Sequence, residues 1–411
     1  MSGPEPDLIA TLRAAFGPQP PRFAIAVSGG GDSVALLHLC CRAFPPATFR
    51  AVTVDHGLRK GSAREAAMVA ELARAAGVRH DVLRWSGWDG QGNLQDAARR
   101  ARYGLMRDWA HGQGIATLAT AHTADDQAET LLMRLARESG VDGLSAMAPR
   151  RNLGGITLLR PLLGVTRAAL RGVLRDNGLP WAEDPGNEDA TFARVRARRV
   201  LAELAPLGIT APGLARVAAQ MREAREALER QTEAAAREIA TLDGGDILLP
   251  REAFHALPAE IARRLMAGAI CWVGDATNPP RRAPLLALLR SPEGTLGGCR
   301  ILPDGEAVRI TREHGAVRDL RSPVSDLWDG RWRLRGPAAG PGLVAGALGP
   351  AGLAQIADWR ASGRPRAALL AGPAVWRGGR LVAAPLAEPG GDWQAERAGG
   401  LAGFFASLLS H

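Results

Sequence analysis

The sequence predicts an α/β protein built on a doubly wound parallel sheet, followed by a helical middle domain and a small α+β C-terminal domain. Short apolar runs suited to buried strands alternate with longer amphipathic helical stretches through its first part. Chemically dense segments begin directly after three of these strands, at residues 28–33, 55–59 and 121–130. Because ligands of such sheets bind beyond the carboxyl ends of the strands, we expect these segments to form one active site.

The first strand, residues 23–27, leads into a glycine-rich turn and then into a helix. Consecutive glycines let backbone N–H groups approach an anion closely, and the helix N-terminus adds positive potential, so the turn predicts a phosphate site. It lacks the Lys of a Walker A loop and the G-x-G-x-x-G spacing of dinucleotide-binding folds. Asp32 would repel phosphate unless a cation lay between them, which predicts Mg²⁺ there; the alternative is an ordinary turn capped by Asp32. The turn consists of Ser28, Gly29, Gly30, Gly31, Asp32 and Ser33.

The motif SGGGDS resembles the pyrophosphate-binding loop of the N-type ATP pyrophosphatases. Enzymes of that family split ATP between its α and β phosphates to adenylate a substrate. The resemblance implies that residues 28–33 bind ATP and that Asp32 takes part in catalysis.

The next elements alternate in the same way. Strands are predicted at residues 49–54, 80–83 and 115–120, with helices at 62–77 and from Asn93 to about His111. This alternation is typical of a parallel sheet covered by helices on both faces.

The segment after the fourth predicted strand, AHTADDQAET at residues 121–130, opens another helix. Asp126 and Glu129 are three residues apart and share a face of it, while His122 precedes its first turn. Acidic residues at a helix N-terminus also compensate the dipole, and that alternative would account for Asp126. His122 and Glu129 go beyond this need, so we favour a metal or nucleotide site.

An arginine-rich face is predicted on the helix that begins at Asn93. Arg99, Arg102 and Tyr103 have the spacing i, i+3, i+4, so one stripe of this helix could contact nucleotide phosphates. A solvated basic face is the alternative.

The chain beyond the sheet contains RPLL at residues 160–163, a predicted helix at 166–177 and a turn-rich loop at 181–187. A basic helix follows, in which Arg194 and Arg196 stand among four arginines in eight residues. These arginines face either RNA or solvent.

Over residues 23–199 these motifs resemble, in kind and order, those of the tRNA(Ile)-lysidine synthetases. HTADDQAET is similar to that family's second motif, although Thr123 stands where a second His is usual. The segment DHGLR at 55–59 matches a D-H-x-L-R landmark, and NLQDAARRARY is similar to the next one. RPLL, the W-x-x-D-P-x-N loop and the R-x-R that follows resemble the closing part of the catalytic domain, with Gly186 in place of Ser.

The resemblance implies a two-step reaction that uses ATP and Mg²⁺. ATP adenylates the C2 oxygen of the wobble cytidine, position 34, in tRNA(Ile) with a CAU anticodon. The ε-amine of free L-lysine then attacks C2 and expels AMP, which leaves lysidine. A wobble base in a single-stranded loop can be reached by such an enzyme.

The resemblance also implies roles for the matched residues. Asp32 and Asp126 are the expected metal ligands, Asp126 and Glu129 hold metal or attract the cationic lysine, and His122 assists proton transfer. Arg99 holds the adenylate phosphate. The remaining expected substrate-binding residues are His56, Arg59, Arg102, Arg194 and Arg196.

Three domains are predicted. The turn at residues 206–213 ends a catalytic domain at 1–212. A helical middle domain at 213–320 and a small C-terminal domain at 321–411 are expected to bind tRNA, as in long members of the family.

Composition agrees with a polyanionic partner without requiring one. Net charge is +9, the isoelectric point is near 10.7, and Lys60 is the one lysine. Arginine pairs bidentately with phosphate, but an arginine-rich genome would give the same bias. The chain shows no membrane-spanning apolar run and no secretory signal, and its four cysteines lack metal spacing, so we expect a cytoplasmic protein. Its oligomeric state stays open, with a homodimer as one alternative.

Alternative functions follow from the same superfamily. A tRNA thiolase would typically carry a C-x-x-C pair, which this chain lacks, and a GMP synthetase of the amidotransferase type would need a glutamine-hydrolysing domain. A non-catalytic RNA-binding protein is the alternative from another class, and the complete SGGGDS and DDQAET motifs argue against it.

Overall fold

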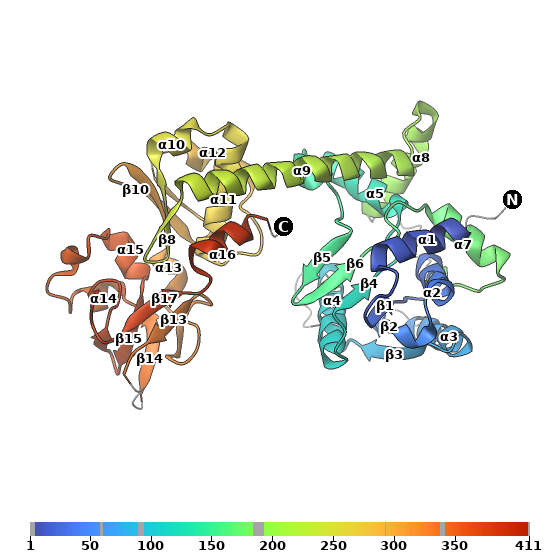
Figure 1. Cartoon of the computed structure of the whole chain (residues 1–411), viewed down its shortest axis with the longest axis horizontal. Coiled ribbons are helices and arrows are strands. Elements are labelled where there is room, and N and C mark those ends of the chain that lie inside the picture. Colours follow the sequence, from blue (N-terminus) through green and yellow to red (C-terminus); the bar gives the residue numbers. More distant parts are fainter. Residues whose placement is uncertain are drawn as a thin grey trace. The chain divides into compact units, whose positions relative to one another are not determined.

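The computed structural model describes residues 5–57, 61–88, 94–183, 193–291, 293–337 and 342–409 (Figure 1). The chain divides into two compact units, Met1–Arg225 and Glu226–His411. The three domains expected with boundaries near residues 212 and 320 stay a prediction.

The first unit is built on a six-stranded sheet in the order β3-β2-β1-β4-β6-β5. Neighbouring strands are parallel except β5, which pairs antiparallel with β6 at one edge. The strand order reverses beside β1 and β4, which creates the crevice at which doubly wound sheets bind ligands. The strands are β1 (Phe23–Ala26), β2 (Phe49–Asp55), β3 (Arg79–Arg84), β4 (Thr117–Ala119), β5 (Arg150–Leu153) and β6 (Ile156–Leu159).

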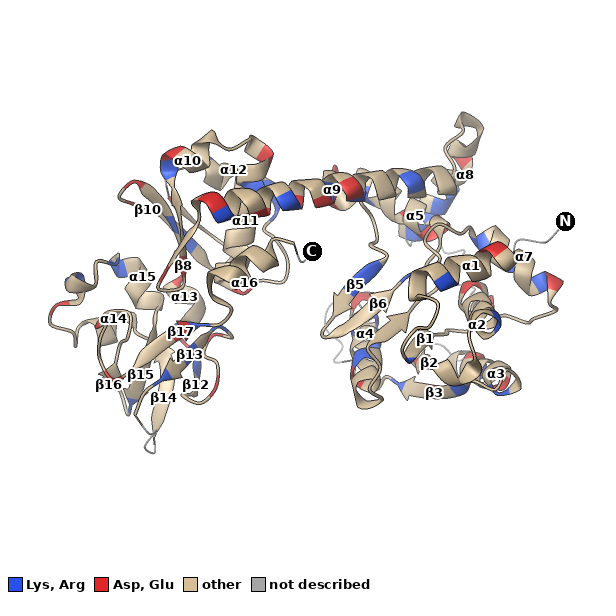
Figure 2. Cartoon of the chain, viewed as in Figure 1, with Lys and Arg blue, Asp and Glu red and all other residues tan. Residues whose placement is uncertain are grey.

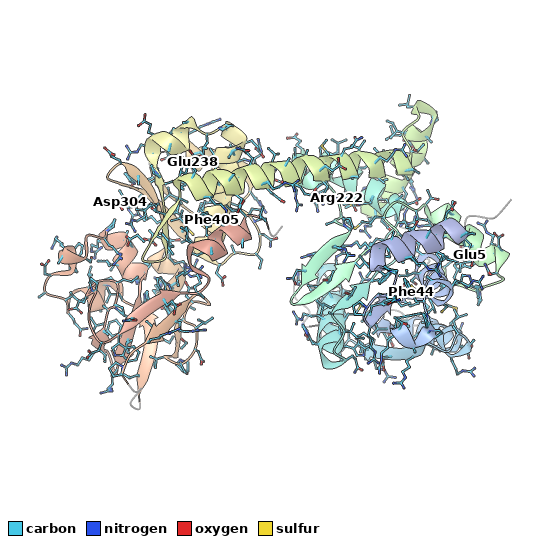
Figure 3. The ribbon with its side chains drawn as sticks, in the orientation of Figure 1. Glu5, Phe44, Arg222, Glu238, Asp304 and Phe405 are labelled. Carbon is cyan, nitrogen blue, oxygen red and sulfur yellow. The ribbon has the colours of Figure 1, made fainter. Side chains whose placement is uncertain are left out.

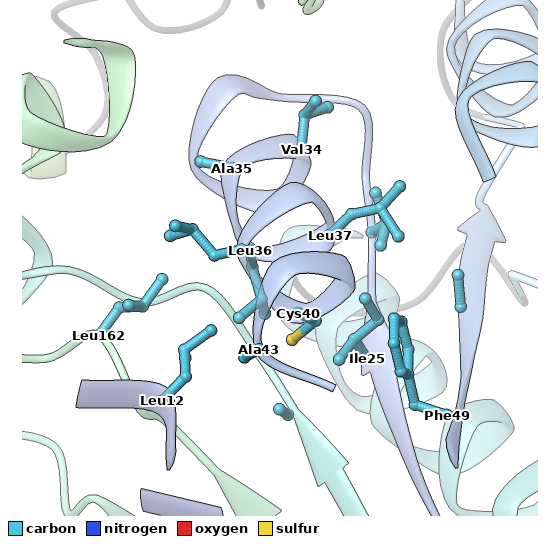
Figure 4. Packing of buried hydrophobic residues seen from close by; sticks show 14 of the residues in the cluster. Leu12, Ile25, Val34, Ala35, Leu36, Leu37, Cys40, Ala43, Phe49 and Leu162 are labelled. Carbon is cyan, nitrogen blue, oxygen red and sulfur yellow. The ribbon is translucent and has the colours of Figure 1, made fainter. Parts of the chain in front are cut away.

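Helices cover both faces of this sheet, as predicted. Successive side chains of a strand point to opposite faces, and in β1 Phe23 and Ile25 join the core on one face while Ala24 joins the core on the other. Figure 4 shows the first of these cores, where Cys40 of α2 lies beside Ile25 of β1. The helices are α1 (Glu5–Phe16), α2 (Gly31–Ala43), α3 (Ser62–Ala75), α4 (Leu94–Gly112), α5 (Ala124–Leu135), α6 (Val141–Leu144), α7 (Arg167–Asp176) and α8 (Ala193–Leu204), with short 3-10 turns at Pro46–Thr48 and Ala205–Leu207.

The β5–β6 hairpin extends the sheet beyond the four strands that the sequence predicted. The hairpin turns at Gly154 and Gly155, both of which have positive φ. Its strands are short and β5 carries two arginines, so no long apolar run marks them. The expected sites at Arg59, Asn93 and residues 184–192 lie outside the described residues.

Helix α9 (Ala211–Ile239) contributes residues to both units. The second unit contains a five-stranded antiparallel sheet in addition to the expected middle helices. Its strands, in the order β7-β8-β11-β10-β9, are β7 (Thr241–Asp243), β8 (Asp246–Pro250), β9 (Gly294–Leu296), β10 (Cys299–Asp304) and β11 (Ala307–Arg312).

Apolar helices cover this second sheet. The core joins Ile247 and Ile310 of the sheet with Leu265 and Ile270 of α11, and C-terminal Phe404 inserts into it. The helices are α10 (Arg251–Ala256), α11 (Ala259–Gly274), α12 (Arg282–Leu289), α13 (His314–Val317) and α16 (Gly400–Ser407).

The rest of the second unit is a smaller α+β region. It contains a four-stranded antiparallel sheet, in the order β12-β14-β15-β16, and a two-stranded sheet formed by β13 and β17. The strands are β12 (Arg321–Pro323), β13 (Trp332–Arg335), β14 (Leu343–Ala347), β15 (Pro373–Arg377), β16 (Arg380–Ala383) and β17 (Gln394–Arg397); the helices are α14 (Gly349–Leu353) and α15 (Arg366–Ala371), with a 3-10 turn at Trp359–Ser362.

Across the described ranges, no single helix is long and apolar enough to cross a membrane. Residues 193–207 and α9 together have the length and apolar composition of a membrane span, but a bend of 99° separates them.

Candidate active site

The glycine-rich turn links β1 to α2 at the sheet's reversal point. The Ser33 hydroxyl accepts a hydrogen bond from the Ser28 backbone N–H at 3.1 Å and donates to the Gly30 carbonyl at 2.8 Å. The hydroxyl oxygens of Ser28 and Ser33 lie 3.2 Å apart. These bonds close the turn around the N-terminus of α2, where free N–H groups favour an anion.

Two of the glycines are required by their surroundings. Gly29 has φ +93°, a left-handed conformation that L side chains rarely adopt. A Cβ on Gly31 would lie 3.3 Å from the indole of Trp181. The Ala182 N–H donates to the Gly29 carbonyl at 2.9 Å, so the loop after α7 also holds the turn.

A cluster of three carboxylates surrounds one guanidinium beside this turn. Arg167 donates from Nε to Asp32 Oδ2 at 3.2 Å and from Nη2 to Asp126 Oδ1 at 3.4 Å, and its Nη1 lies 3.5 Å from Glu129 Oε1. Arg198 approaches the same Glu129 oxygen with Nε at 2.5 Å. The structure therefore brings the three predicted acidic residues together from α2 and α5.

This cluster is not fully compensated. Asp32 Oδ1 and Glu129 Oε2 are buried without a hydrogen-bond partner. Burial raises the pKa of Asp32, Arg167 opposes this shift, and the charge of Asp126 adds to it. A buried carboxylate oxygen without a donor is unfavourable unless a cation or a proton reaches it.

Thr123, which departs from the family pattern, has a clear structural role. It is the N-cap of α5: its hydroxyl oxygen accepts from the Asp126 backbone N–H at 3.3 Å, and Asp126 Oδ2 accepts from the Thr123 backbone N–H at 2.9 Å. The result is a capping box that fixes the orientation of Asp126. Burial alone would raise the pKa of Asp126, but the Thr123 N–H and Arg167 hold that pKa below its usual value.

The charges of Asp126 and of a group of arginines both act on His122. Burial lowers the pKa of His122 to about 4, Asp126 opposes this shift, and Arg160, Arg194 and Arg99 reinforce it. Its Nδ1 lies 2.9 Å from the Thr120 hydroxyl. His122 is therefore a neutral imidazole near pH 7, able to exchange a hydrogen bond but not to supply a positive charge.

The predicted arginine face of α4 is present. The guanidinium carbons of Arg99 and Arg102 both lie 5.3 Å from the centroid of the Tyr103 ring, within the range of cation–π attraction. Burial lowers the pKa of Arg102, and Arg99 and Arg194 lower it further. These arginines make no ion pair with a carboxylate among the described residues, so they can accept an anion.

A cavity of about 390 Å³ collects most of the predicted site residues. Asp126 and the added residues Arg167, Arg171 and Arg198 belong to its lining. Five predicted residues are outside the lining found for the described residues, and one of them, Arg196, is exposed on α8. The five are Gly29, Arg99, Glu129, Arg194 and Arg196. The predicted residues that line the cavity are Ser28, Gly30, Gly31, Asp32, Ser33, His56, Arg102, His122 and Asp126.

Sequence reasoning missed Arg167 and the contact of Arg198 with Glu129. Arg167 stands at the first position of α7, after the N-cap Thr166, where a cation opposes the helix dipole. That unfavourable placement is a sequence signal that could have singled it out. Arg198 offers no such signal, because it is one of several arginines on α8.

The carboxylates fit a magnesium ion that is only partly held by protein. Asp32 and Asp126 each lie within 3.4 Å of the same guanidinium, and the unpartnered Asp32 Oδ1 is an oxygen ligand of the kind Mg²⁺ prefers. No group of three or more His, Cys, Asp or Glu residues in the described ranges is arranged to hold a metal by itself. Mg²⁺ usually takes one or two carboxylates and completes its shell with phosphate oxygens and water.

Comparison with known proteins identifies relatives of the whole chain. Residues 6–205 match the family model of the PP-loop domain. A tRNA(Ile)-lysidine synthase from Ruegeria pomeroyi is 55% identical over 412 aligned residues, which cover 98% of this chain and 98% of the relative. Another from Methylobacterium nodulans is 45% identical over 63% of this chain and 77% of the relative.

Solved structures give a more distant similarity. The U34-tRNA thiolase NcsA from Methanococcus maripaludis aligns with a TM-score of 0.46 and 14% identity, over 53% of this chain and 77% of that one.

Proposed function

Because the chain belongs to the tRNA(Ile)-lysidine synthase family, ATP-dependent ligases that modify tRNA, we propose that it joins free L-lysine to the wobble cytidine of tRNA(Ile) with a CAU anticodon. The observation that carries this proposal is the single cavity that unites the phosphate-binding turn with the carboxylate cluster. The relatives do not favour a thiolase or an amidotransferase-type synthetase.

The turn and the carboxylates divide the work of the first step. Backbone N–H groups within the turn, between Ser28 and Ser33, would bind the β and γ phosphates of ATP, which leave as pyrophosphate. Asp32 and Asp126 would hold Mg²⁺, which when bound neutralises charge on the phosphate oxygens. Arg167 would then release Asp32 and remain available to the phosphates, since guanidinium pairs well with them.

Arg99 and Arg102 would supply positive charge to the nucleotide. Arg99 and Asp126 act on His122 in opposite directions, since Arg99 lowers its pKa and Asp126 raises it. We propose that Arg99 holds the α-phosphate of the adenylated cytidine. Arg102, which lines the cavity, and Arg194 would bind the nucleotide that carries it.

The second step needs a neutral amine from a substrate that is cationic in solution. The carboxylates of Asp126 and Glu129 would attract the ε-ammonium group. No described residue donates a hydrogen bond to Glu129 Oε2, so this oxygen can accept one from the substrate. His122 is uncharged, so its imidazole would take a proton from the ε-ammonium group, which frees the lone pair of the amine nitrogen to attack C2. AMP leaves as the carbon–nitrogen bond forms.

Roles for His56, Arg59 and Arg196 in substrate binding stay predictions, as do a homodimeric state and a cytoplasmic location. Of these three residues, His56 lines the cavity.

The direct test is incorporation of labelled lysine into a tRNA(Ile) transcript with a CAU anticodon. We expect incorporation that requires ATP and Mg²⁺, releases AMP and pyrophosphate, and stops in Asp32→Ala. ATP cleavage without lysine incorporation would leave the adenylation chemistry intact and show that the acceptor is wrong.

A further inference from the structure

A second cavity, of about 480 Å³, lies in the first unit and is assigned no role by the reaction described above. Its charged lining consists of four arginines, Arg150, Arg160, Arg216 and Arg222, and we name it the arginine groove. Within the described residues its lining includes no Asp or Glu, and none of the four makes an ion pair with a carboxylate. Uncompensated arginines around one cavity indicate an anionic ligand.

The groove also has an apolar lining beside its arginines. Small or apolar residues line it from the end of α1, from Pro161 and Leu163 after β6, and from α9. On α9, Pro212, Ala215 and Arg222 recur at helical spacing, which turns one face of this helix toward the groove. A lining that combines apolar residues with these arginines suits a nucleotide strand, whose sugars and bases pack while its phosphates bind the arginines.

Two of the elements that line the groove, α9 and β5, carry basic residues, which Figure 2 shows as blue bands. Figure 3 labels Arg222 on α9.

Arg160 belongs to the lining of the groove and not to that of the catalytic cavity, but its charge acts on His122 of that cavity. It is 5% exposed, its Nη1 donates to the Ala148 carbonyl at 2.7 Å, and its Nε is buried without a partner. Its charge also reaches His122, whose pKa it helps to lower. One buried guanidinium thus faces the groove and acts electrostatically on the reaction centre.

Burial lowers the pKa of Arg160, the Tyr103 hydroxyl opposes this shift, and the charge of Arg151 reinforces it. A phosphate at the groove would relieve this repulsion, because it would supply the negative charge that the protein does not.

We propose that the arginine groove binds the phosphodiester backbone of the tRNA strand next to the nucleotide that enters the catalytic cavity. The inference rests on the proposed function and adds to it a binding site for the RNA strand. ATP already has an anion site in the turn at residues 28–33, so a second phosphate site of this size is not needed for it.

The test removes two groove charges that lie on α9, away from the catalytic residues. Arg216→Gln/Arg222→Gln is compared with the control Arg74→Gln/Arg79→Gln. The control loses the same charge from exposed positions on α3 and β3, at the opposite edge of the sheet. Binding of tRNA(Ile) transcript is measured over a series of KCl concentrations, with KM for tRNA and for ATP.

We expect the groove variant to bind tRNA about 10- to 100-fold more weakly, with the slope of log K against log[KCl] reduced by about 2. The KM for ATP should stay within twofold of the wild-type value, and Arg216→Lys/Arg222→Lys should recover most of the affinity because it keeps the charges. The control should bind tRNA as the wild type does.

Three results would overturn the proposal. Unchanged tRNA affinity and salt slope would remove the groove from RNA binding. A raised KM for ATP with unchanged tRNA affinity would assign the groove to the nucleotide, and an equal loss in the control would indicate a general field effect. If the wild type binds tRNA without transferring lysine, the proposed function fails, while the salt series still decides the role of the groove.

Discussion

Two arginines, the half-buried Arg167 in the first unit and the buried Arg309 in the second, each face three carboxylates, yet the two clusters differ in geometry. Arg309 donates to Asp243, Asp246 and Asp304 at 2.7–2.9 Å. Figure 3 labels Asp304 at the end of β10. Arg167 contacts its three carboxylates at 3.2–3.5 Å.

The difference extends to what each cluster leaves unsatisfied. The Arg309 side chain is 3% exposed, a second arginine, Arg364, binds Asp243, and no carboxylate oxygen of this described cluster is buried without a partner. The Arg167 side chain is 20% exposed, borders a cavity, and leaves oxygens of Asp32 and Glu129 without donors.

The comparison teaches that composition does not separate a structural ion cluster from a site. One arginine among three acids stabilises a fold when every group is paired at short distance. The same set prepares a site for a cation when distances are long and oxygens stay unpaired.

The largest expected effect tests the carboxylate cluster around Arg167. Asp32→Asn should lower kcat/KM for lysine transfer by about 10³-fold, because it removes the proposed Mg²⁺ ligand beside the leaving group. The free energy of unfolding should not fall, since burial already disfavours the charge of Asp32. Asp243→Asn is the matched control and should keep its activity; a loss of less than threefold in Asp32→Asn would contradict the assignment.

A substitution in the cluster around Arg309 should change the free energy of unfolding instead of the activity. Arg309→Met leaves three acids without their common partner and should lower the free energy of unfolding by about 3–5 kcal/mol in urea titrations. Arg167→Met should lower the free energy of unfolding by less, because water and cations can reach the carboxylates around Arg167. If Arg309→Met loses no more stability than Arg167→Met, the distinction between the clusters fails.

A pH series sharpens the same contrast. Burial raises the pKa of Asp246 to about 6, Arg309 opposes this shift, and Asp243 adds to it. The folded state therefore holds a proton that the unfolded state releases near pH 4, so this contribution is present below pH 4 and is lost as pH rises to about 6. The loss amounts to about 3 kcal/mol.

Asp246→Asn should remove that dependence from denaturation curves measured between pH 4 and 7. If the free energy of unfolding changes with pH equally in the wild type and the variant, the pKa of Asp246 is not raised and the prediction is wrong.

The smallest effect concerns the cap that orients Asp126. Thr123→Ala should lower the free energy of unfolding by about 1 kcal/mol, because the hydroxyl no longer accepts the Asp126 N–H. Thr123→Ser keeps the hydroxyl and should behave as the wild type in thermal melts. Equal melting temperatures for the Ala and Ser variants would remove the capping role.

The sequence predicted those parts of the site that follow from local spacing. SGGGDS indicates a strand, a turn and a helix, and the spacing of Asp126 and Glu129 places both on one side of α5. Both patterns depend on neighbours within a few residues, so the chain alone determines them.

What the sequence could not predict depends on distant contacts. Arg167 and Asp32 are separated by 135 residues, and Arg198 and Glu129 by 69, so only the folded chain shows that they meet. The β5–β6 hairpin was missed because its short strands carry little apolar pattern. Strands β7 and β9 of the second unit were missed for the same reason, since each has only three residues.

The most direct test of the contrast is Mn²⁺ binding, followed by electron paramagnetic resonance in the presence of a non-hydrolysable ATP analogue. Mn²⁺ substitutes for Mg²⁺ at oxygen-rich sites. We predict a protein-bound Mn²⁺ signal for the wild type and for Asp243→Asn that is lost in Asp32→Asn. A signal that survives in Asp32→Asn and disappears in Asp243→Asn would contradict the account.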